Sequence, residues 1–246
     1  MSRYLIIINY RTLITLFFSI LMPLVAYKFR VVYNIDLTLL SIAIIFPLVF
    51  TIRGAFRRRE KALEHLSSFR ASIKTVINIF KSSPKILDED KKEAEKHLSL
   101  VNEYLFKHLS TPDENPKEYD EKIEDFYNFL SKKSELIGNG NREKALRFFR
   151  DTIASSDNLI AIHSHRTPVS LKAYCLIFIY IFPAVYTPTI INKIGLDGPS
   201  WITFFIVILS EFILISLYNI QDQMEYPFDD EGLDDIKFKL FQTYRK

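Results

Sequence analysis

The chain separates long apolar segments from a long charged region. Apolar residues are concentrated in four segments, at 13–27, 37–52, 171–191 and 201–220. Most charged residues lie between positions 53 and 166. A soluble core mixes apolar and polar residues along the chain, so this segregation favours a membrane protein. A membrane-spanning helix needs roughly 20 apolar residues, and the two shorter segments reach that length if flanking aromatic and basic residues lie at the interfaces.

We therefore predict an all-α membrane protein with four transmembrane helices, at about 12–27, 37–53, 171–191 and 201–220. The alternative for the first segment is a cleaved signal peptide, because Arg3 and Arg11 precede an apolar stretch. Residues 24–29 contain no small-x-small cleavage site, and a second apolar segment follows within ten residues. We expect the first segment to stay in the mature protein.

The distribution of basic residues predicts the orientation in the membrane. The net charge of +3 is too small to indicate nucleic-acid binding. Basic residues follow the second apolar segment and precede the third: Arg53, Arg57, Arg58, Arg59 and Lys61, then His163, His165, Arg166 and Lys172. The positive-inside rule places both termini and the middle region in the cytoplasm, although Lys28 and Arg30 run against the bias. We expect a multi-pass protein of the cell (inner) membrane, in contact with lipid.

These patterns divide the chain into four parts. They are an N-terminal transmembrane hairpin at 1–56, a cytoplasmic helical region at 57–166, a C-terminal transmembrane hairpin at 167–220 and an acidic cytoplasmic tail at 221–246.

The middle region is predicted to be helical throughout. Apolar residues at helical spacing continue beyond the second span, so one helix is expected to run from the membrane to about residue 81. Further helices are expected at 88–109, with Asp88 as the N-cap, and at 117–137. Gly138-Asn139-Gly140 predicts a turn, and Asn141 the cap of the helix that follows.

Prolines interrupt the apolar segments at Pro47, Pro183 and Pro188. Each removes one backbone donor and leaves a carbonyl without its helical partner. Such carbonyls are tolerated within a membrane when protein buries them or when they line a wet cavity. An ordinary kink between packed helices explains any one proline equally well, but three of them favour a cavity.

Ile42, Phe46 and Phe50 recur every four residues, so they lie near one face of a helix. If several copies surround an axis, these side chains form stacked apolar rings that pass ions and can gate by dewetting. Periodicity alone equally fits residues that pack against other helices or lipid.

The order of these features resembles the bestrophin family of pentameric ion channels. Two N-terminal spans, a helical cytoplasmic region and two further spans are followed by Pro227-Phe228 and an acidic run. Ile42, Phe46 and Phe50 fall on the family's pore-neck positions, counted back from Phe56 and Arg58. Thr167-Pro168, leading into 178–183, is similar to the Thr-Pro and aromatic-Pro pattern of bacterial members.

The resemblance implies a homopentamer that passes chloride or other small anions through an apolar neck. The family includes bacterial members thought to favour cations, so a cation-selective channel stays an alternative. A non-conducting membrane scaffold, whose cytoplasmic helices bind a partner, is a second alternative. The family's aromatic-Asp-Arg signature reads Phe56-Arg57-Arg58 here, which puts its local salt bridges in doubt.

Calcium is the one cofactor that the resemblance suggests. In members with a calcium clasp, acidic side chains four and seven residues beyond the proline serve it, and here these are Glu231 and Asp234. The usual Pro-Phe-Gly reads Pro227-Phe228-Asp229, and the run fails the EF-hand pattern because Pro227 would stand at loop position one. A solvated acidic tail is an equally good interpretation.

Three charged residues are candidates for the pore mouth. Arg53 and Arg57 at the end of the second helix would form a ring that concentrates anions, or would serve as positive-inside anchors. Glu211 lies in the middle of the fourth span, where a carboxylate usually faces a cavity or a partner. A structural hydrogen bond to a neighbouring helix is its competing interpretation.

No set of residues predicts catalysis, so we do not expect an enzyme. His163 and His165 are two residues apart, on different helix faces, and lack a third ligand for zinc. The single Cys175 lies within the third span, which favours a small packing residue over a nucleophile or a disulfide partner.

Overall fold

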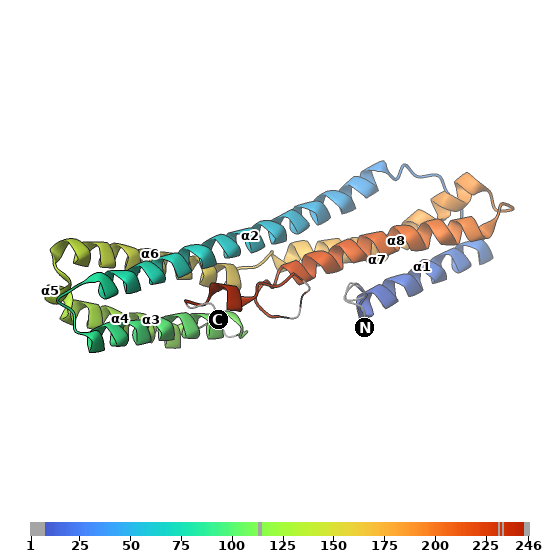
Figure 1. Ribbon diagram of the computed structural model, residues 1–246. Helices are drawn as coiled ribbons and strands as arrows, with labels where there is room; N and C mark the ends of the chain where they lie inside the picture. Colours follow the sequence, from blue (N-terminus) through green and yellow to red (C-terminus); the bar gives the residue numbers. More distant parts are fainter. Residues whose placement is uncertain (1–7, 113–114, 231, 233, 244–246) are drawn as a thin grey trace. The chain divides into compact units, whose positions relative to one another are not determined.

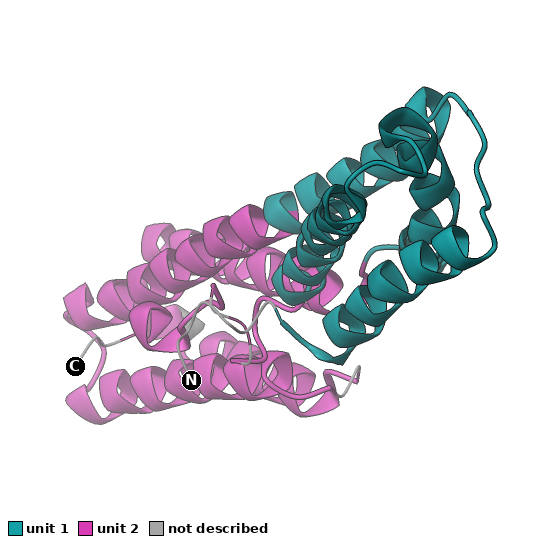
Figure 2. Ribbon diagram, turned by 90° about the vertical axis from the view of Figure 1, so that its right-hand side faces the viewer, with its two compact units in different colours: residues 1–57, 167–225 teal, residues 58–166, 226–246 magenta. Residues whose placement is uncertain are grey.

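The computed structural model describes residues 8–112, 115–230, 232 and 234–243, and every regular element among them is helical (Figure 1). The helices are α1 Tyr10–Lys28, α2 Thr38–Ser82, α3 Asp88–Leu109, α4 Lys117–Lys132, α5 Ser134–Ile137, α6 Asn139–Ser164, α7 Val169–Ile194, α8 Ser200–Met224 and the 3₁₀ turn η2 Phe238–Phe241. They form two compact units, coloured separately in Figure 2: unit 1 is 1–57 with 167–225, and unit 2 is 58–166 with 226–246.

Unit 1 contains the helices predicted to cross the membrane. The stretches long and apolar enough to span a bilayer are Tyr10–Lys28, Thr38–Ser82, Asn139–Ile194 and Ser200–Met224, and they include all four predicted spans. In this unit α8 packs against α1 and α7, and α1 packs against α7. A second apolar contact joins Ile44 and Leu48 of α2 to Ile179 and Ile215 of α7 and α8. The prediction of an all-α membrane protein with four membrane helices is confirmed.

Helix α2 is a single helix of 45 residues, as the spacing of its apolar residues predicted. Its second half belongs to unit 2, where Leu66, Phe69, Ile73 and Phe80 are buried. These side chains recur at three- and four-residue intervals, which places them on one face. They share an apolar core with α3, α4 and α6, in which the Phe126 ring lies 4.9 Å from that of Phe149.

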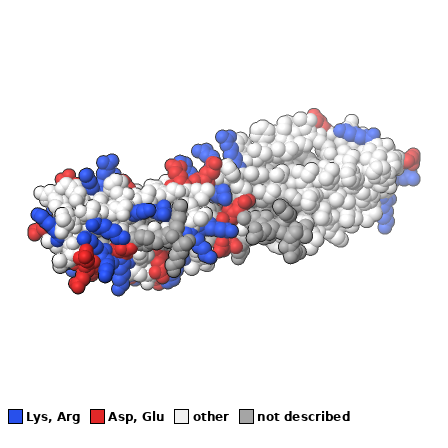
Figure 3. All heavy atoms as spheres, viewed as in Figure 1, with Lys and Arg blue, Asp and Glu red and all other residues white. Residues whose placement is uncertain are grey.

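The two units differ in surface chemistry. Lys, Arg, Asp and Glu cover much of unit 2, whereas the uncharged surface of unit 1 is interrupted mainly at its ends (Figure 3). Large apolar side chains are exposed on unit 1, among them Leu13, Phe17, Leu39, Trp201 and Phe205. An exposed apolar surface of this extent is characteristic of a protein that contacts lipid or other subunits.

Tyrosine hydroxyls satisfy two of the carbonyls that proline sets free. Pro47 leaves the carbonyl of Ala43 without its helical donor, and Tyr174 Oη donates to it at 3.3 Å. Pro188 does the same to Ala184, and Tyr33 Oη lies 3.4 Å from that oxygen and 3.2 Å from the carbonyl oxygen of Val185. At these two prolines a tyrosine hydroxyl satisfies the freed carbonyl, a role that the sequence pattern had suggested for a wet cavity.

The helix boundaries in unit 2 differ from the prediction at one place. The helix expected at 117–137 is interrupted at Lys133, and α5 follows as a separate short turn. Gly138 adopts a φ of 81°, which glycine accommodates without strain, so it reverses the chain alone. Helix α6 therefore begins at Asn139, and the prediction of Asn141 as its cap is wrong. At α3 the N-cap is Leu87, one residue before the predicted Asp88.

Loss of a proline-linked tyrosine hydroxyl should weaken unit 1. We expect Tyr33→Phe and Tyr174→Phe each to lower the free energy of unfolding by about 1 kcal/mol, because a carbonyl within an apolar segment then lacks a donor. Thermal or SDS-induced unfolding in detergent measures the change. Tyr127→Phe, at an exposed ring on α4, is the matched control and should be neutral. Equal stability of all three variants would contradict the role assigned to the hydroxyls.

Candidate functional site

One face of the membrane half of α2 is apolar and exposed. Ile42, Phe46 and Phe50 keep 46%, 57% and 60% of their surface accessible in the single chain. The rings of Phe46 and Phe50 are neighbours, with centroids 6.1 Å apart. At a rise of about 1.5 Å per residue, the three side chains cover about 12 Å along the helix. They form a continuous apolar row, here called the α2 row.

The opposite face of the same helix is buried. Ile44, Leu48, Thr51 and Ala55 are almost wholly inaccessible, and they follow helical spacing. The hydroxyl of Thr51 donates to the carbonyl of Leu48 at 2.8 Å, so this face offers no free donor from that side chain. Helix α2 therefore turns its packing face into unit 1 and leaves the α2 row uncovered by its own chain.

Arg53 and Arg57 continue the α2 row along the helix. Successive steps of three and four residues from Phe50 lead to them, and both side chains are exposed. Two guanidinium groups per chain thus follow an apolar stretch on one helix face. Several copies around an axis would place a positive ring beside a set of apolar rings.

Glu211 does not join these residues. Its side chain is 0% exposed and lies on the inward face of α8, together with Val207, Leu214 and Ile215. Neither carboxylate oxygen has a hydrogen-bond partner among the described residues. Its two interpretations, a charge at the pore mouth and a structural hydrogen bond to a neighbouring helix, stay predictions.

An ion-pair network links one end of three membrane helices. Lys172 Nζ at the start of α7 lies 2.6 Å from Asp222 Oδ1 and 2.9 Å from Glu225 Oε2, at the end of α8. Arg11 at the start of α1 donates to the other Asp222 oxygen at 2.8 Å. Glu225, whose side chain is fully buried, also accepts from the Thr167 amide at 2.6 Å. The first two acidic residues of the predicted tail, Asp222 and Glu225, are therefore paired with basic residues.

Residues 226–230, 232 and 234–243 of unit 2 are held by aromatic and polar contacts. The Phe238 ring stacks on Phe106 of α3 at 4.6 Å and on Phe228 at 5.7 Å. Arg59 donates to the Asp234 carbonyl at 2.7 Å, and Arg70 donates to the Gln242 carbonyl at 2.9 Å. These contacts pack the segment on α2 and α3, while the side chains of Asp229, Asp230 and Asp234 are exposed, so the solvated acidic run stays a prediction.

The structure describes one of the two residues predicted to bind calcium. Glu231 lies outside the described residues, and the Asp234 side chain is exposed. Over the described ranges, no group of three or more His, Cys, Asp or Glu side chains could hold a metal ion. His163 packs its ring near His108 and Phe228, at 5.5 and 6.4 Å. Calcium binding stays a prediction.

The acidic stretch of the tail contains one carboxyl with an unusual pKa. Partial burial, with Asp229 and Asp230 nearby, raises the pKa of Asp235 to about 6, although the Gly232 amide donates to it at 2.6 Å. A carboxyl whose pKa is near 6 changes its charge close to physiological pH. Nothing in the sequence pattern distinguished Asp235 from its acidic neighbours.

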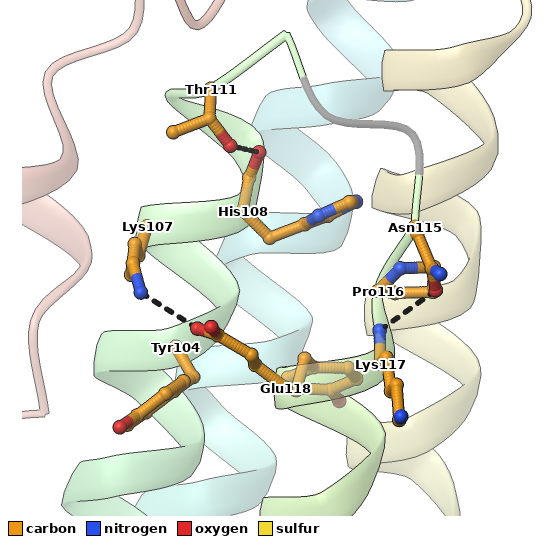
Figure 4. Close-up of a pocket in the computed structure, with 9 residues that line it drawn as sticks. Tyr104, Lys107, His108, Thr111, Asn115, Pro116, Lys117 and Glu118 are labelled. Atoms are coloured by element: carbon orange, nitrogen blue, oxygen red, sulfur yellow. Dashed lines mark hydrogen bonds and ion pairs between the residues drawn. The ribbon is translucent and has the colours of Figure 1, made fainter.

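Unit 2 also has a surface cleft of 360 Å³ between the end of α3 and the start of α4 (Figure 4). Tyr104, Lys107, His108 and Glu118 are among its lining residues. Lys107 Nζ lies 2.6 Å from Glu118 Oε2 and also near the Tyr104 ring, at 5.5 Å from its centroid. This ion pair uses the charges of two lining residues, and Lys117 adds a further cation to the lining.

Breaking the Lys172 network should destabilise unit 1. Lys172→Met leaves the buried Glu225 without its cation, and removing one partner of a buried pair costs about 3 kcal/mol or more. Unfolding in detergent measures the loss. Lys61→Met, which breaks an exposed pair with Glu64, is the control and should change stability by less than about 0.5 kcal/mol. Similar stabilities of the two variants would show that the network is dispensable.

Attachment of the tail should depend on pH through Asp235. The pKa of Asp235 in the folded chain, about 6, exceeds that of an unfolded Asp, so its contribution is complete at low pH and disappears as pH rises through 6. We expect stronger amide-exchange protection of 234–243 at pH 5 than at pH 7, after correction for intrinsic rates. Asp235→Asn should abolish the difference and the exposed control Asp234→Asn should keep it. A pH dependence that survives Asp235→Asn would refute this assignment.

Comparisons with known proteins give a fold and no closer relationship. The sequence matches no protein-family model and no curated protein. Solved structures do match. A bacterial bestrophin homologue from Klebsiella pneumoniae, phased with zinc, aligns with a TM-score of 0.76 and 11% identity over 94% of this chain and 93% of that chain.

Two further structures give the same result. A Klebsiella pneumoniae bestrophin homologue with a tyrosine-to-alanine substitution has a TM-score of 0.75 and 12% identity, over 94% of this chain and 93% of that chain. A membrane protein with a proline-to-alanine substitution has a TM-score of 0.76 and 13% identity, over 98% and 95%. The chain therefore has the fold of the bacterial bestrophin homologues along nearly its whole length.

Proposed function

We propose that this chain is the subunit of a pentameric, bestrophin-like channel that passes chloride or other small anions. The observation that carries the proposal is the division of α2 into a buried face and the exposed α2 row. The fold shared with bestrophin homologues supports it, since the predicted neck positions coincide with this exposed face. Five copies around an axis would turn the row into three stacked apolar rings, with both termini in the cytoplasm.

The chemistry of the α2 row suits weakly hydrated anions. The edge of an aromatic ring carries partial positive charge, so Phe46 and Phe50 can offer an anion weak contacts that do not require a polar ligand. An apolar constriction also sets a dewetting barrier that controls when ions pass. Arg53 and Arg57 lie next along the helix, where their field would raise the local anion concentration.

The acidic residues give less support to the cation alternative. A cation channel of this design needs carboxylates near the axis. Asp222 and Glu225 are paired with Lys172, and Glu211 is buried between helices. Within unit 1, the charged residues exposed on the face of the α2 row are the two arginines, and the Glu64 carboxylate further along α2 is paired with Lys61 at 2.6 Å. This favours anions over cations in the proposed pore.

Truncation of the neck should change ion flux. In liposomes, Phe46→Ala and Phe50→Ala should raise chloride flux roughly tenfold, the effect of lowering a barrier by about 1.4 kcal/mol. Phe17→Ala on α1 and Phe205→Ala on α8 remove equally exposed rings from other helices and should leave flux unchanged. An unaltered flux in the α2 variants would remove the neck assignment.

The ion selectivity of the channel can be measured in the same liposomes. Reversal potentials across a salt gradient should follow the chloride equilibrium, and Arg53→Gln with Arg57→Gln should reduce the anion preference. A potential that follows the cation would reverse the selectivity proposal and leave the pore intact.

Native mass spectrometry should find five copies. A detergent-stable monomer without flux would instead favour the non-conducting scaffold.

A further inference from the structure

Glu211 occupies a position that the proposed pore does not use. It stands at the middle of the 25-residue helix α8, is fully buried, and has no hydrogen bond to either oxygen within the described residues. An ionised carboxylate in such a place is an uncompensated charge, and a buried group usually avoids that cost by taking up a proton. The surroundings of Glu211 show which form they can accommodate.

Contacts at the two ends of the α1–α8 pair determine which residue of α1 stands level with Glu211. At one end Asn219 Nδ2 lies 2.9 Å from Thr12 Oγ1, and at the other Tyr27 Oη lies 2.9 Å from Thr203 Oγ1. The two helices therefore run antiparallel with a fixed register. Counting inward from both ends brings Ser19 level with Glu211. Ser19 is itself fully buried on the inward face of α1.

Helix α1 offers acceptors at this level but no free hydroxyl proton. The Thr15 hydroxyl donates to the carbonyls of Arg11 and Thr12, at 3.0 and 2.9 Å. The Ser19 hydroxyl donates to the Thr15 carbonyl at 2.8 Å. Pro23, four residues beyond Ser19, has no amide hydrogen, so the Ser19 carbonyl lacks its helical donor. A carboxylate needs donors, whereas a carboxylic acid supplies one.

Charged groups of the packed helices lie at their ends. Arg11, Lys172 and Asp222 form the network at one end, and Lys28 and Lys193 stand near the other. Between these ends the titratable residues are Tyr27 of α1, Tyr174, Cys175, Tyr180 and Tyr186 of α7, and Tyr218 of α8, while α2 has none before Arg53. No cation therefore faces Glu211 from α1 or α7.

We propose that Glu211 is a proton-binding site inside the subunit. The folded chain carries the proton on the Glu211 carboxyl, which donates it to the Ser19 carbonyl left free by Pro23. This hydrogen bond joins the middles of α8 and α1, and loss of the proton leaves a charge that forces the helices apart or draws water between them. The site belongs to one chain and does not depend on pore formation or on the identity of the permeant ion.

Infrared spectroscopy of the purified protein detects the proton directly. A carboxylic acid has a carbonyl stretching band well separated from the carboxylate bands, and it shifts in D₂O. At pH 7.5 this band should be present in the wild type, absent in Glu211→Gln and retained in the control Asp235→Asn. Identical spectra for the wild type and Glu211→Gln would overturn the proposal.

Isotope labelling removes any dependence on how the variant folds. Incorporation of ¹³C-carboxyl glutamate should shift the band in wild-type protein, because the protonated group is a glutamate. A band that does not shift, or no band, would refute the site.

Stability separates the donor role from simple space filling. Glu211→Gln keeps a neutral donor of similar size and should have nearly the melting temperature of the wild type, whereas Glu211→Ala should melt clearly lower. If Gln and Ala are equally damaging, the donor to Ser19 is not what holds the helices. Neither result affects the assignment of Ile42, Phe46 and Phe50 to the pore neck, which the measurement of chloride flux tests.

Discussion

The membrane unit depends on pairing the charged groups that its sequence places at the ends of apolar helices. Lys172 shows how this is done for charge: it neutralises Asp222 and Glu225 together, and Arg11 completes the set. The network connects α1, α7 and α8 where they leave the apolar region, so it defines their register along the helix axes. An unpaired member would be costly there, since a buried ion without a partner loses hydration and gains nothing in return.

With α1, α7 and α8 held in this way, α2 is free to serve a different purpose. It contributes one face to the packing of unit 1 and leaves the α2 row uncovered. A monomeric soluble protein would pay for such exposure with aggregation, whereas a membrane protein can cover it with lipid or with other copies.

Features that depend on residues close together in the sequence could be predicted, whereas contacts between distant residues could not. The apolar segments, the long α2 and the common face of Ile42, Phe46 and Phe50 are local periodicities, and such periodicities can be read directly. Lys172 and Asp222 are separated by fifty positions, and Tyr33 is about 150 positions from the carbonyls that it caps. The sequence shows that these residues are present. Which partners they contact is decided by how the helices pack. The N-cap of α6 was placed three residues too late, at Asn141 instead of Gly138, because one left-handed glycine sufficed where three turn-forming residues suggested a longer turn.

The prolines and Glu211 pose the same physical problem, and their different solutions explain why Glu211 stands apart. A freed carbonyl needs a donor, and Tyr174 and Tyr33 provide it at Ala43 and Ala184. Pro23 frees the Ser19 carbonyl, yet α1 has no tyrosine at this level and its hydroxyl protons are already used. The group on the facing helix is a carboxyl with two unused oxygens. As an acid it can supply the missing donor and satisfy both groups, whereas as an anion it would leave both unsatisfied. The arrangement of acceptors on α1 therefore favours the protonated form of Glu211.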